Sequence, residues 1–459
     1  MSSYLITSTK KSSGKTIITI GLSALLREMK YKLSVFKKGP DYIDPLWISQ
    51  ASGCQCYNLD FNTMSNGEIK KLYMDKTKIS NISIVEGNKG LFDGVSLDGS
   101  DSNAQLAKFL NLKTILVIDC AGITRGIAPL VNGYEQFDKN IKYKGIILNN
   151  IATDRHEGKI INALKEYTNL KVIGSVHKNS DLNIIEQHLG LEPSFLKSNT
   201  KTIKNISTII KSSIDYKYLV KGLKKKKMNT LAKRVTVSPD YSDIKLGVAL
   251  DNAFGFYYAD DIDKIKSLGV KICYFNTIKN KKLPKVDALL IGGGFPELFA
   301  SKLNFNKNMM ESIKDFVEAN KPVYAECGGL MYLAKSIKYN NKTIKMVGAI
   351  DGKVVMNSKP VGRGYVELAQ HLRHPWPMES DIIRAHEFHY SNITLNKKIN
   401  SFAYKVKRGY GINGKYDGVL YKNLLATYSH LRDTNQSMWI KNYLQFVKNN
   451  KNHEAKNYI

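Results

Sequence analysis

The sequence has few cysteines and no long apolar run. Its five cysteines include only one close pair, Cys54 and Cys56, which matches neither a disulfide framework nor a zinc-binding spacing. No stretch approaches the roughly 20 apolar residues of a membrane-spanning helix. The first residues enter a strand-like pattern at once, without the basic and apolar segments of a signal peptide. These absences predict a cytoplasmic protein with reduced thiols and no membrane partner.

Acidic residues are also scarce, since 40 Asp and Glu stand against 69 Lys and Arg, for a formal net charge of +29. Such a charge can indicate binding to nucleic acid or to an acidic membrane. The lysines are spread along the chain, however, and the main cluster, Lys224 to Lys227, falls in an expected linker. A basic surface also suits small polyanionic substrates, so we expect no nucleic-acid partner.

The chain of 459 residues is too long for one ordinary core. Strand-like runs alternate with helical patterns in both halves, which predicts an α/β fold with two doubly wound domains. We expect a first domain at 1–211, a Lys-rich linker at 212–243, a second domain at 244–440 and a basic tail at 441–459. The expected strands are Tyr4–Ser8, Leu33–Lys37, Ile82–Glu86, Thr114–Asp119, Gly145–Asn149, Val172–Val176, Lys245–Leu250, Lys271–Phe275, Ala288–Ile291 and Pro322–Ala325.

The segment from Thr9 to Thr16 follows the first expected strand and opens the first helix, which is the context of a P-loop. Its backbone N–H groups would hold phosphate oxygens, Lys15 would reach the outer phosphates, and the Thr16 hydroxyl would bind Mg²⁺. Thr9 replaces the usual first glycine, so a chance Gly-Lys-Thr is the alternative. Lys10 lies where MinD/ParA-type ATPases carry an extra phosphate-contacting lysine.

Four acidic residues follow two other expected strands. Asp41 and Asp44 come after one of them, and Glu86 and Asp93 end or follow the other. Carboxyl ends of parallel strands meet at one edge of the sheet, where ligands bind, and Mg²⁺ prefers oxygen ligands. For a single Asp the alternative is capping of a turn.

Cys327 separates the apolar run Val-Tyr-Ala-Glu from Gly328 and Gly329. This pattern predicts a strand, a tight turn that exposes the thiol, and a helix whose first N–H groups can stabilise an oxyanion. The helix N-terminus would also favour the thiolate. The alternative is a small buried cysteine, which would not need the glycines.

Ten ordered motifs resemble the cobyrinic acid a,c-diamide synthase family. They are Ser13-Gly14-Lys15-Thr16, Lys38-Gly39-Pro40-Asp41-Tyr42-Ile43-Asp44-Pro45, Asn58-Leu59-Asp60, Glu86-Gly87 with Gly90-Leu91-Phe92-Asp93-Gly94, His188-Leu189-Gly190-Leu191, Gly292-Gly293-Gly294-Phe295-Pro296-Glu297, Ala325-Glu326-Cys327-Gly328-Gly329-Leu330, Gly362-Arg363-Gly364-Tyr365, His386-Glu387-Phe388-His389-Tyr390-Ser391 and Ser429-His430-Leu431.

The resemblance implies a dethiobiotin-synthetase-like ATPase domain fused to a class I glutaminase-like domain. Cys327 would attack glutamine, His430 would be its base, and Gly293, Gly294 and Gly328 would form the oxyanion hole. Many class I glutaminases carry a Glu two residues after this histidine. Arg432 stands there, so the resemblance implies a Cys–His dyad.

The resemblance also implies a function for the synthetase half. It would convert the a and c acetates of a polycarboxylate tetrapyrrole to amides, with ATP, Mg²⁺ and glutamine. The protein would act as a monomer or a homodimer. The acceptor would be cobyrinate, with sirohaem or nickel-sirohydrochlorin as alternatives. A MinD/ParA-like positioning ATPase is the alternative from another class. The implied sites are Lys10, Ser13, Gly14, Lys15, Thr16 and Asn149 for ATP, with Asn149 reading adenine; Thr16, Asp44 and Glu86 for metal; and Asp41, Asp44 and Asp93 for positioning substrate or metal.

Overall fold

A computed structural model describes residues 1–182, 186–187, 190–191, 199–223, 239–371, 373–396 and 401–456. His188 and Leu189 of one motif and the Lys224 to Lys227 cluster lie outside these residues. The chain divides into two compact units, Met1–Thr230 and Leu231–Ile459, each of which is described by itself.

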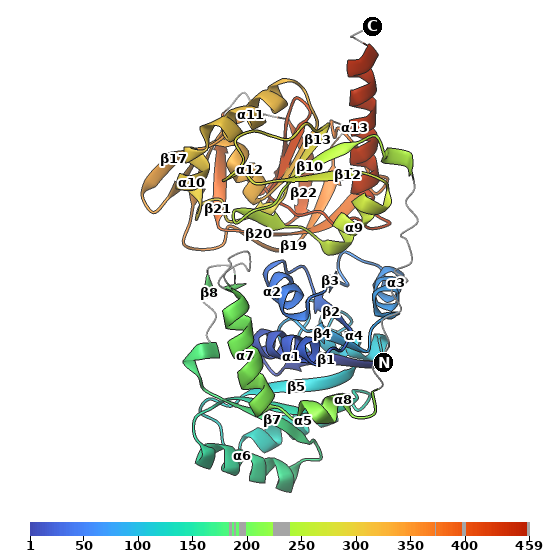
Figure 1. Ribbon diagram of the computed structural model, residues 1–459, viewed down its shortest axis with the longest axis vertical. Helices are drawn as coiled ribbons and strands as arrows, with labels where there is room; N and C mark the ends of the chain where they lie inside the picture. The colour runs from blue at the N-terminus through green and yellow to red at the C-terminus, as the bar shows by residue number, and fades with distance from the viewer. Residues whose placement is uncertain are drawn as a thin grey trace. The chain divides into compact units, whose positions relative to one another are not determined.

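The first unit contains a parallel sheet, seven-stranded over the described residues. Figure 1 shows helices on both sides of it. The predicted doubly wound sheet of this half is confirmed. Its strands, in sheet order, are β3 (Cys56–Leu59), β2 (Leu33–Lys38), β4 (Ile82–Glu86), β1 (Ser2–Ser8), β5 (Lys113–Asp119), β6 (Tyr143–Ile151) and β7 (Val172–His177).

The helices of this unit complete the α/β alternation. β1, β2 and β4 lie side by side, so the segments that follow them meet at one edge of the sheet. The helices are α1 (Lys15–Glu28), α2 (Ile43–Ser52), α3 (Asn66–Thr77), α4 (Asn103–Phe109), α5 (Ile127–Phe137), α6 (Asp154–Tyr167), α7 (Asn199–Ser213) and α8 (Tyr216–Val220), with a short pair of strands, β8 (Glu186–Gln187) and β9 (Gly190–Leu191).

The start of the expected linker is structured. α7 extends into it, and α8 lies wholly within 212–243. Ile214 and Leu219 are buried, and the Leu219 carbonyl accepts a hydrogen bond from the Tyr4 hydroxyl. Residues 212–220 thus belong to the first unit, because their few apolar side chains are buried there. The Lys-rich composition of the segment gave no sign of this packing.

The second unit is built on a nine-stranded mixed sheet, counted over the described residues. Its parallel part is β12 (Lys271–Phe275), β10 (Lys245–Ala249), β13 (Ala288–Ile291), β15 (Val323–Glu326) and β24 (Leu424–Thr427), and its antiparallel part is β23 (Tyr416–Tyr421), β22 (Phe402–Arg408), β19 (Gly362–Gln370) and β20 (Ile382–His389).

Apart from the edge strand β12, the parallel strands of this sheet are buried on both faces. Leu289 and Ile291 belong to one apolar core, whereas Ala288 and Leu290 belong to the other, as the period of two in a strand requires. Two more sheets and five helices complete the described part: β11 (Phe254–Phe256) with β14 (Gly293–Gly294); β17 (Lys342–Lys345), β16 (Ala334–Tyr339), β18 (Ile350–Met356) and β21 (Ser391–Leu395); and α9 (Ala259–Ser267), α10 (Ala300–Phe305), α11 (Lys307–Glu318), α12 (Gly328–Leu333) and α13 (Trp439–Lys456).

The expected basic tail contains a core helix. α13 buries Tyr443, Leu444 and Val447 in one of the two apolar cores, and the Tyr443 hydroxyl donates to the Leu289 carbonyl at 2.8 Å. The Lys and Asn content of this segment hid an apolar face spaced at three to four residues.

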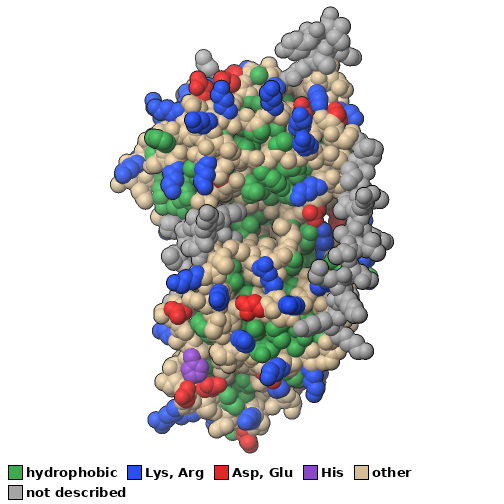
Figure 2. Space-filling view, viewed as in Figure 1, with side chains coloured by type: hydrophobic (Ala, Val, Ile, Leu, Met, Phe, Trp, Pro, Cys, Tyr) green, Lys and Arg blue, Asp and Glu red, His purple; other side chains and the backbone are tan. Residues whose placement is uncertain are grey.

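Positive charge is dispersed on the face drawn in Figure 2. On the face shown in Figure 2, Lys and Arg side chains are scattered over both units without forming a continuous patch. Among the described residues, no helix has both the length and the apolar character needed to cross a bilayer.

Candidate active sites

The predicted phosphate-binding loop lies between β1 and α1. Gly14 has φ +90°, and a Cβ there would lie 2.1 Å from Asn149 Nδ2, so only glycine fits. The same Nδ2 donates to the Ser13 carbonyl at 3.0 Å. The Asn149 side chain therefore supports the backbone of the loop, whereas the resemblance implied that it contacts adenine.

The two lysines of the loop have different surroundings. Lys15 is buried, and its Nζ donates to Ser8 Oγ at 2.9 Å. Burial and the nearby Lys37 ammonium lower the pKa of Lys15 to about 8. Lys10 is exposed, and its Nζ lies 3.0 Å from a carboxylate oxygen of Asp119, so it is paired within its own chain.

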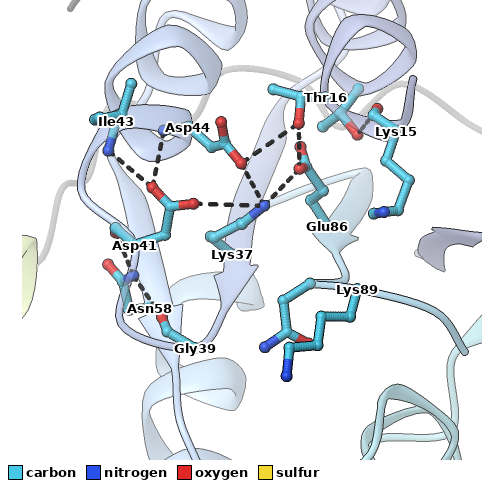
Figure 3. Close-up of polar contacts among 12 residues, drawn as sticks. Lys15, Thr16, Lys37, Gly39, Asp41, Ile43, Asp44, Asn58, Glu86 and Lys89 are labelled. Atoms are coloured by element: carbon cyan, nitrogen blue, oxygen red, sulfur yellow. Dashed lines mark hydrogen bonds and ion pairs between the residues drawn. The ribbon is translucent and has the colours of Figure 1, made fainter. Parts of the chain in front are cut away.

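Three predicted acidic residues surround a lysine that the sequence analysis did not single out. The Lys37 Nζ lies 2.5 Å from Asp44 Oδ2, 2.6 Å from Glu86 Oε1 and 3.8 Å from Asp41 Oδ2. Figure 3 shows this acid–lysine cluster beside the first turn of α1. Thr16 Oγ1 donates to Glu86 Oε1 at 2.8 Å and lies 3.4 Å from Asp44 Oδ2.

Burial and mutual charge set the protonation of the cluster. Burial acts to lower the pKa of Lys37, but Asp44 and Glu86 outweigh it and hold that pKa well above its usual value. Burial raises the pKa of Glu86, and it also raises that of Asp41, to about 7, with the Asp44 charge adding to the effect. Burial opposes ionisation of Asp44 too, yet the Lys37 ammonium keeps its pKa below the usual range. Lys37 is thus a fixed positive charge.

The oxygens of this cluster suit a magnesium ion. Thr16 Oγ1, Asp44 Oδ2 and Glu86 Oε1 converge, and Glu86 Oε2 is buried without a hydrogen-bond partner among the described residues. An unsatisfied buried carboxylate oxygen next to hard oxygen donors is a ligand set that Mg²⁺ prefers.

Asp41 and Asp93 also stabilise the local backbone. Asp41 Oδ1 accepts from the Ile43 and Asp44 N–H groups at 2.9 and 3.1 Å at the start of α2. Asp93 is exposed, and its Oδ2 accepts from the Gly90 N–H at 2.8 Å. Asp93 therefore caps its own turn, which was the alternative for a single Asp, and does not join the acid–lysine cluster.

Cys327 lies at the turn between β15 and α12. Its φ is +46°, a strained value for a residue other than glycine, and its N–H donates to the Thr427 carbonyl at 2.7 Å. The thiol is buried. Burial, followed by the charges of Glu297 and Glu326, raises the pKa of Cys327. The Gly328 N–H at the start of α12 lowers this pKa, as expected for a helix N-terminus, but desolvation of the thiol outweighs it.

The three glycines assigned to the oxyanion hole lie near the turn. A Cβ on Gly328 would lie 2.9 Å from the Gly294 N and 3.0 Å from its carbonyl oxygen. A Cβ on Gly293 would lie 2.5 Å from His430 Cε1. Gly294 thus packs against Gly328, the residue after Cys327, and Gly293 packs against His430.

His430 follows β24 and is tied to β20. It exchanges backbone hydrogen bonds with His386, and the two imidazole rings stack at 4.9 Å with an interplanar angle of 15°. Arg432, where a triad acid was expected, is buried and pairs with Asp260 Oδ2 on α9 at 2.7 Å. Arg432 therefore anchors the segment on α9.

Two acidic residues missed by the sequence analysis flank His430. Glu326 Oε2 lies 3.4 Å from His430 Nδ1. Asp417 accepts from the Tyr428 and Ser429 N–H groups at 3.0 and 2.9 Å, just before the histidine. The only signal in the sequence was that Glu326 is an acid in an otherwise apolar strand.

Comparisons with known proteins cover both units. Residues 4–191 match a model described as the CobQ/CobB/MinD/ParA nucleotide binding domain, and residues 245–437 match a CobB/CobQ-like glutamine amidotransferase domain. Proteins named cobyrinate a,c-diamide synthase are similar over nearly the whole chain. The one from Magnetococcus marinus is 38% identical and covers 95% of this chain and 94% of its own. The one from Picrophilus torridus is 37% identical, with 94% and 95% covered.

Solved structures resemble part of the chain. PurLQS from Thermotoga maritima is 17% identical, covers 45% of this chain and 98% of its own, and has a TM-score of 0.34. This likeness is too low to support a functional argument.

Proposed function

The chain belongs to the cobyrinate a,c-diamide synthase family, and we propose that it catalyses the ATP- and glutamine-dependent conversion of the a and c acetate groups of cobyrinate to amides. The observation that carries the proposal is that one chain holds two sites. One is a buried thiol at a strained turn, where the neighbouring glycines pack against His430, and the other is a P-loop beside the acid–lysine cluster. A MinD/ParA-like positioning ATPase would not need the first of these sites.

In the glutaminase half, Cys327 attacks the side-chain amide carbon of glutamine. His430 takes the thiol proton as the S–C bond forms, and the carbonyl electrons move to oxygen, beside the backbone of Gly328 and Gly294. When the C–N bond breaks, the same proton passes to the leaving nitrogen and ammonia departs. Water then gives a proton to His430 and cleaves the thioester to glutamate, which restores the thiol.

In the synthetase half, the loop of Ser13, Gly14, Lys15 and Thr16 holds the phosphates of ATP, with Asn149 bracing it. The acceptor carboxylate attacks the terminal phosphorus, and ADP leaves. The resulting acyl phosphate is open to ammonia, which displaces phosphate and loses a proton. Lys37 supplies a fixed positive charge that stabilises the negative charge on the phosphoryl group during transfer, and Asp41 and Asp44 help to place the acceptor.

The acid–lysine cluster is also the place for magnesium. Thr16, Asp44 and Glu86 would hold Mg²⁺, which neutralises phosphate charge when it is bound. We assign the protein to a reducing cytoplasm, in keeping with five cysteines that are all free thiols.

The test is an assay of the purified chain with ATP, Mg²⁺ and cobyrinate, using glutamine or ammonium chloride as the nitrogen source. We expect the product mass to change as one and then two carboxyl groups become carboxamides. Sirohaem serves as a second acceptor and should be converted far more slowly. No mass change with either acceptor would rule out the synthetase function.

Two variants separate the half-reactions. Cys327→Ser should lose glutamine hydrolysis and keep amidation from ammonium chloride, whereas Lys15→Ala should do the reverse. Glutamine hydrolysis that survives Cys327→Ser unchanged would contradict the glutaminase assignment.

A further inference from the structure

The Cys327 thiol needs a well-oriented base. Because its burial among Glu297 and Glu326 disfavours the thiolate, the proton must move to His430 as the thiol attacks. An imidazole can accept that proton only on an unprotonated nitrogen, so its other nitrogen must carry the hydrogen. Class I glutaminases with a Glu two residues after the histidine can fix this tautomer with that Glu, but here that position is Arg432.

The surroundings of His430 define which nitrogen faces which group. A Cβ on Gly293 would lie 2.5 Å from Cε1 and 3.4 Å from Nε2, so this edge of the ring faces the glycines beside the thiol. The opposite nitrogen, Nδ1, lies 3.4 Å from Glu326 Oε2. Both side chains are buried, at 4% and 6% exposure, so little water screens the pair.

The Glu326 carboxylate is itself held in place. Its Oε1 accepts from the Tyr324 hydroxyl at 2.7 Å and from the Leu431 N–H at 2.9 Å. These two donors fix one oxygen and leave the other directed at His430. Since Leu431 follows His430 directly, one carboxylate positions both the backbone and the ring of the histidine.

The remaining neighbours have other partners. Arg432 pairs with Asp260 and lies over the Tyr258 ring, 4.7 Å from its centroid. The Tyr258 hydroxyl is 3.1 Å from His386 Nδ1. His386 stacks on the face of His430, and burial keeps its own pKa well below the usual range. The neutral His386 ring therefore covers one face of the His430 ring and adds no charge.

We propose that Glu326, the residue just before the nucleophile, is the positioning residue that holds the proton on Nδ1 of His430 and leaves Nε2 to accept the thiol proton. Its carboxylate faces the ring and stabilises the imidazolium that forms. The inference rests on the proposed glutaminase function and replaces the simple Cys–His dyad with a triad whose acid comes from β15.

Glu326→Gln is the sharpest test. The amide oxygen can still accept from Tyr324 and Leu431, but its NH₂ group faces Nδ1 and favours the wrong tautomer. By analogy with the Asp→Asn change in a serine protease triad, we expect kcat for glutamine hydrolysis to fall about 10²- to 10⁴-fold, with KM changed less than about threefold. Glu326→Asp keeps the negative charge, and its kcat should be at least about tenfold higher than that of Glu326→Gln.

Two further readouts separate positioning from a merely structural role. Amidation from ammonium chloride should stay within about twofold of wild type in both variants, because that half does not use His430. The ¹⁵N resonances of His430, assigned with His430→Gln, should move from the Nδ1–H to the Nε2–H tautomer in Glu326→Gln. Glu318→Gln, an exposed acid paired with Lys422 in the same unit, is the matched control and should leave kcat unchanged.

The outcomes separate this inference from the proposed function. Wild-type kcat in Glu326→Gln, together with an inactive Cys327→Ser, would overturn the role of Glu326 and leave the glutaminase function standing. An unchanged His430 tautomer in Glu326→Gln would also overturn it. So would an equal loss of kcat for glutamine hydrolysis in Glu326→Gln and Glu326→Asp, if both variants also lose amidation from ammonium chloride. No glutamine hydrolysis by the wild-type protein would instead contradict the proposed function.

Discussion

Lys15 holds its proton less firmly than an ordinary lysine because it is buried beside another ammonium group. Bound phosphates would raise its pKa above the value of about 8 in the free protein. ATP binding should therefore take up a proton above that pH, and ATP affinity should fall as the pH rises through it. Titration calorimetry at about pH 7 and about pH 9.5, in buffers of different ionisation heat, measures both effects. Equal affinity at both pH values without proton uptake would contradict the prediction.

Gly293 is the residue whose lack of a side chain leaves room for His430. We expect Gly293→Ala to push the imidazole away from the thiol, since a Cβ would lie 2.5 Å from Cε1. Glutamine hydrolysis should fall at least about tenfold because a small misplacement of a catalytic group is costly. Amidation from ammonium chloride should be unchanged.

The matched control is Gly158→Ala in α6, where a Cβ meets no atom within 4 Å. It should keep both activities and gain about 1 kcal/mol of stability from helix propensity. Full glutaminase activity in Gly293→Ala would show that His430 does not depend on this close approach.

Lys37 tests the charge balance of the synthetase site. Lys37→Gln leaves Asp41, Asp44 and Glu86 without the ammonium that now offsets them. Removing one partner of such a buried cluster costs about 3–5 kcal/mol. We expect a lower midpoint of urea unfolding and loss of amidation from ammonia, with glutamine hydrolysis retained. Lys78→Gln, at an exposed pair with Asp75, is the control and should change neither.

The sequence predicted the residues whose chemistry has a local signature and missed those that act through space. Cys327 was recognisable because glycines follow it, and Lys15 because of its loop. Glu326 and Lys37 read as ordinary strand residues, and only the fold brings Glu326 to His430, more than one hundred positions later. Arg432 was interpreted only as the absence of a triad acid at its position. Its role is the ion pair with Asp260 on α9, which lies far from it in the sequence.

At the scale of elements, the strands that carry the sites were predictable because they are continuous apolar runs buried on both faces of a sheet. The amphipathic ends of the two units were not. α8 lies in a Lys-rich segment and α13 is itself rich in Lys and Asn. Each helix has only a few buried side chains, so composition alone does not distinguish it from a solvated tail. Their place in the fold depends on contacts that are distant in sequence.

α13 provides the prediction at this scale. A chain that ends at residue 440 loses the buried Tyr443, Leu444 and Val447 and the hydrogen bond from Tyr443 to the Leu289 carbonyl. Burial of each apolar side chain contributes about 1.5–3 kcal/mol to the free energy of unfolding. We therefore expect this truncation to lower the melting temperature of the second unit strongly. A chain that ends at residue 452 keeps these three side chains and should melt like the full chain. Calorimetry compares them, and equal melting temperatures would show that α13 adds no stability.

At the scale of the whole molecule, the physical reason for joining the two activities is that free ammonia is mostly protonated near neutral pH, and ammonium is not a nucleophile. Release of ammonia on the chain that carries the activated carboxylate raises its effective concentration. A mixture of Lys15→Ala and Cys327→Ala chains contains one intact site of each kind on separate molecules. We expect its glutamine-dependent amidation at about pH 7 to be at least about tenfold slower than that of wild type at equal site concentration. Ammonium chloride at higher pH should restore the rate through the intact synthetase site of Cys327→Ala. A mixture as fast as wild type at neutral pH would show that ammonia passes freely through solution and that the joining of the two units has no kinetic role.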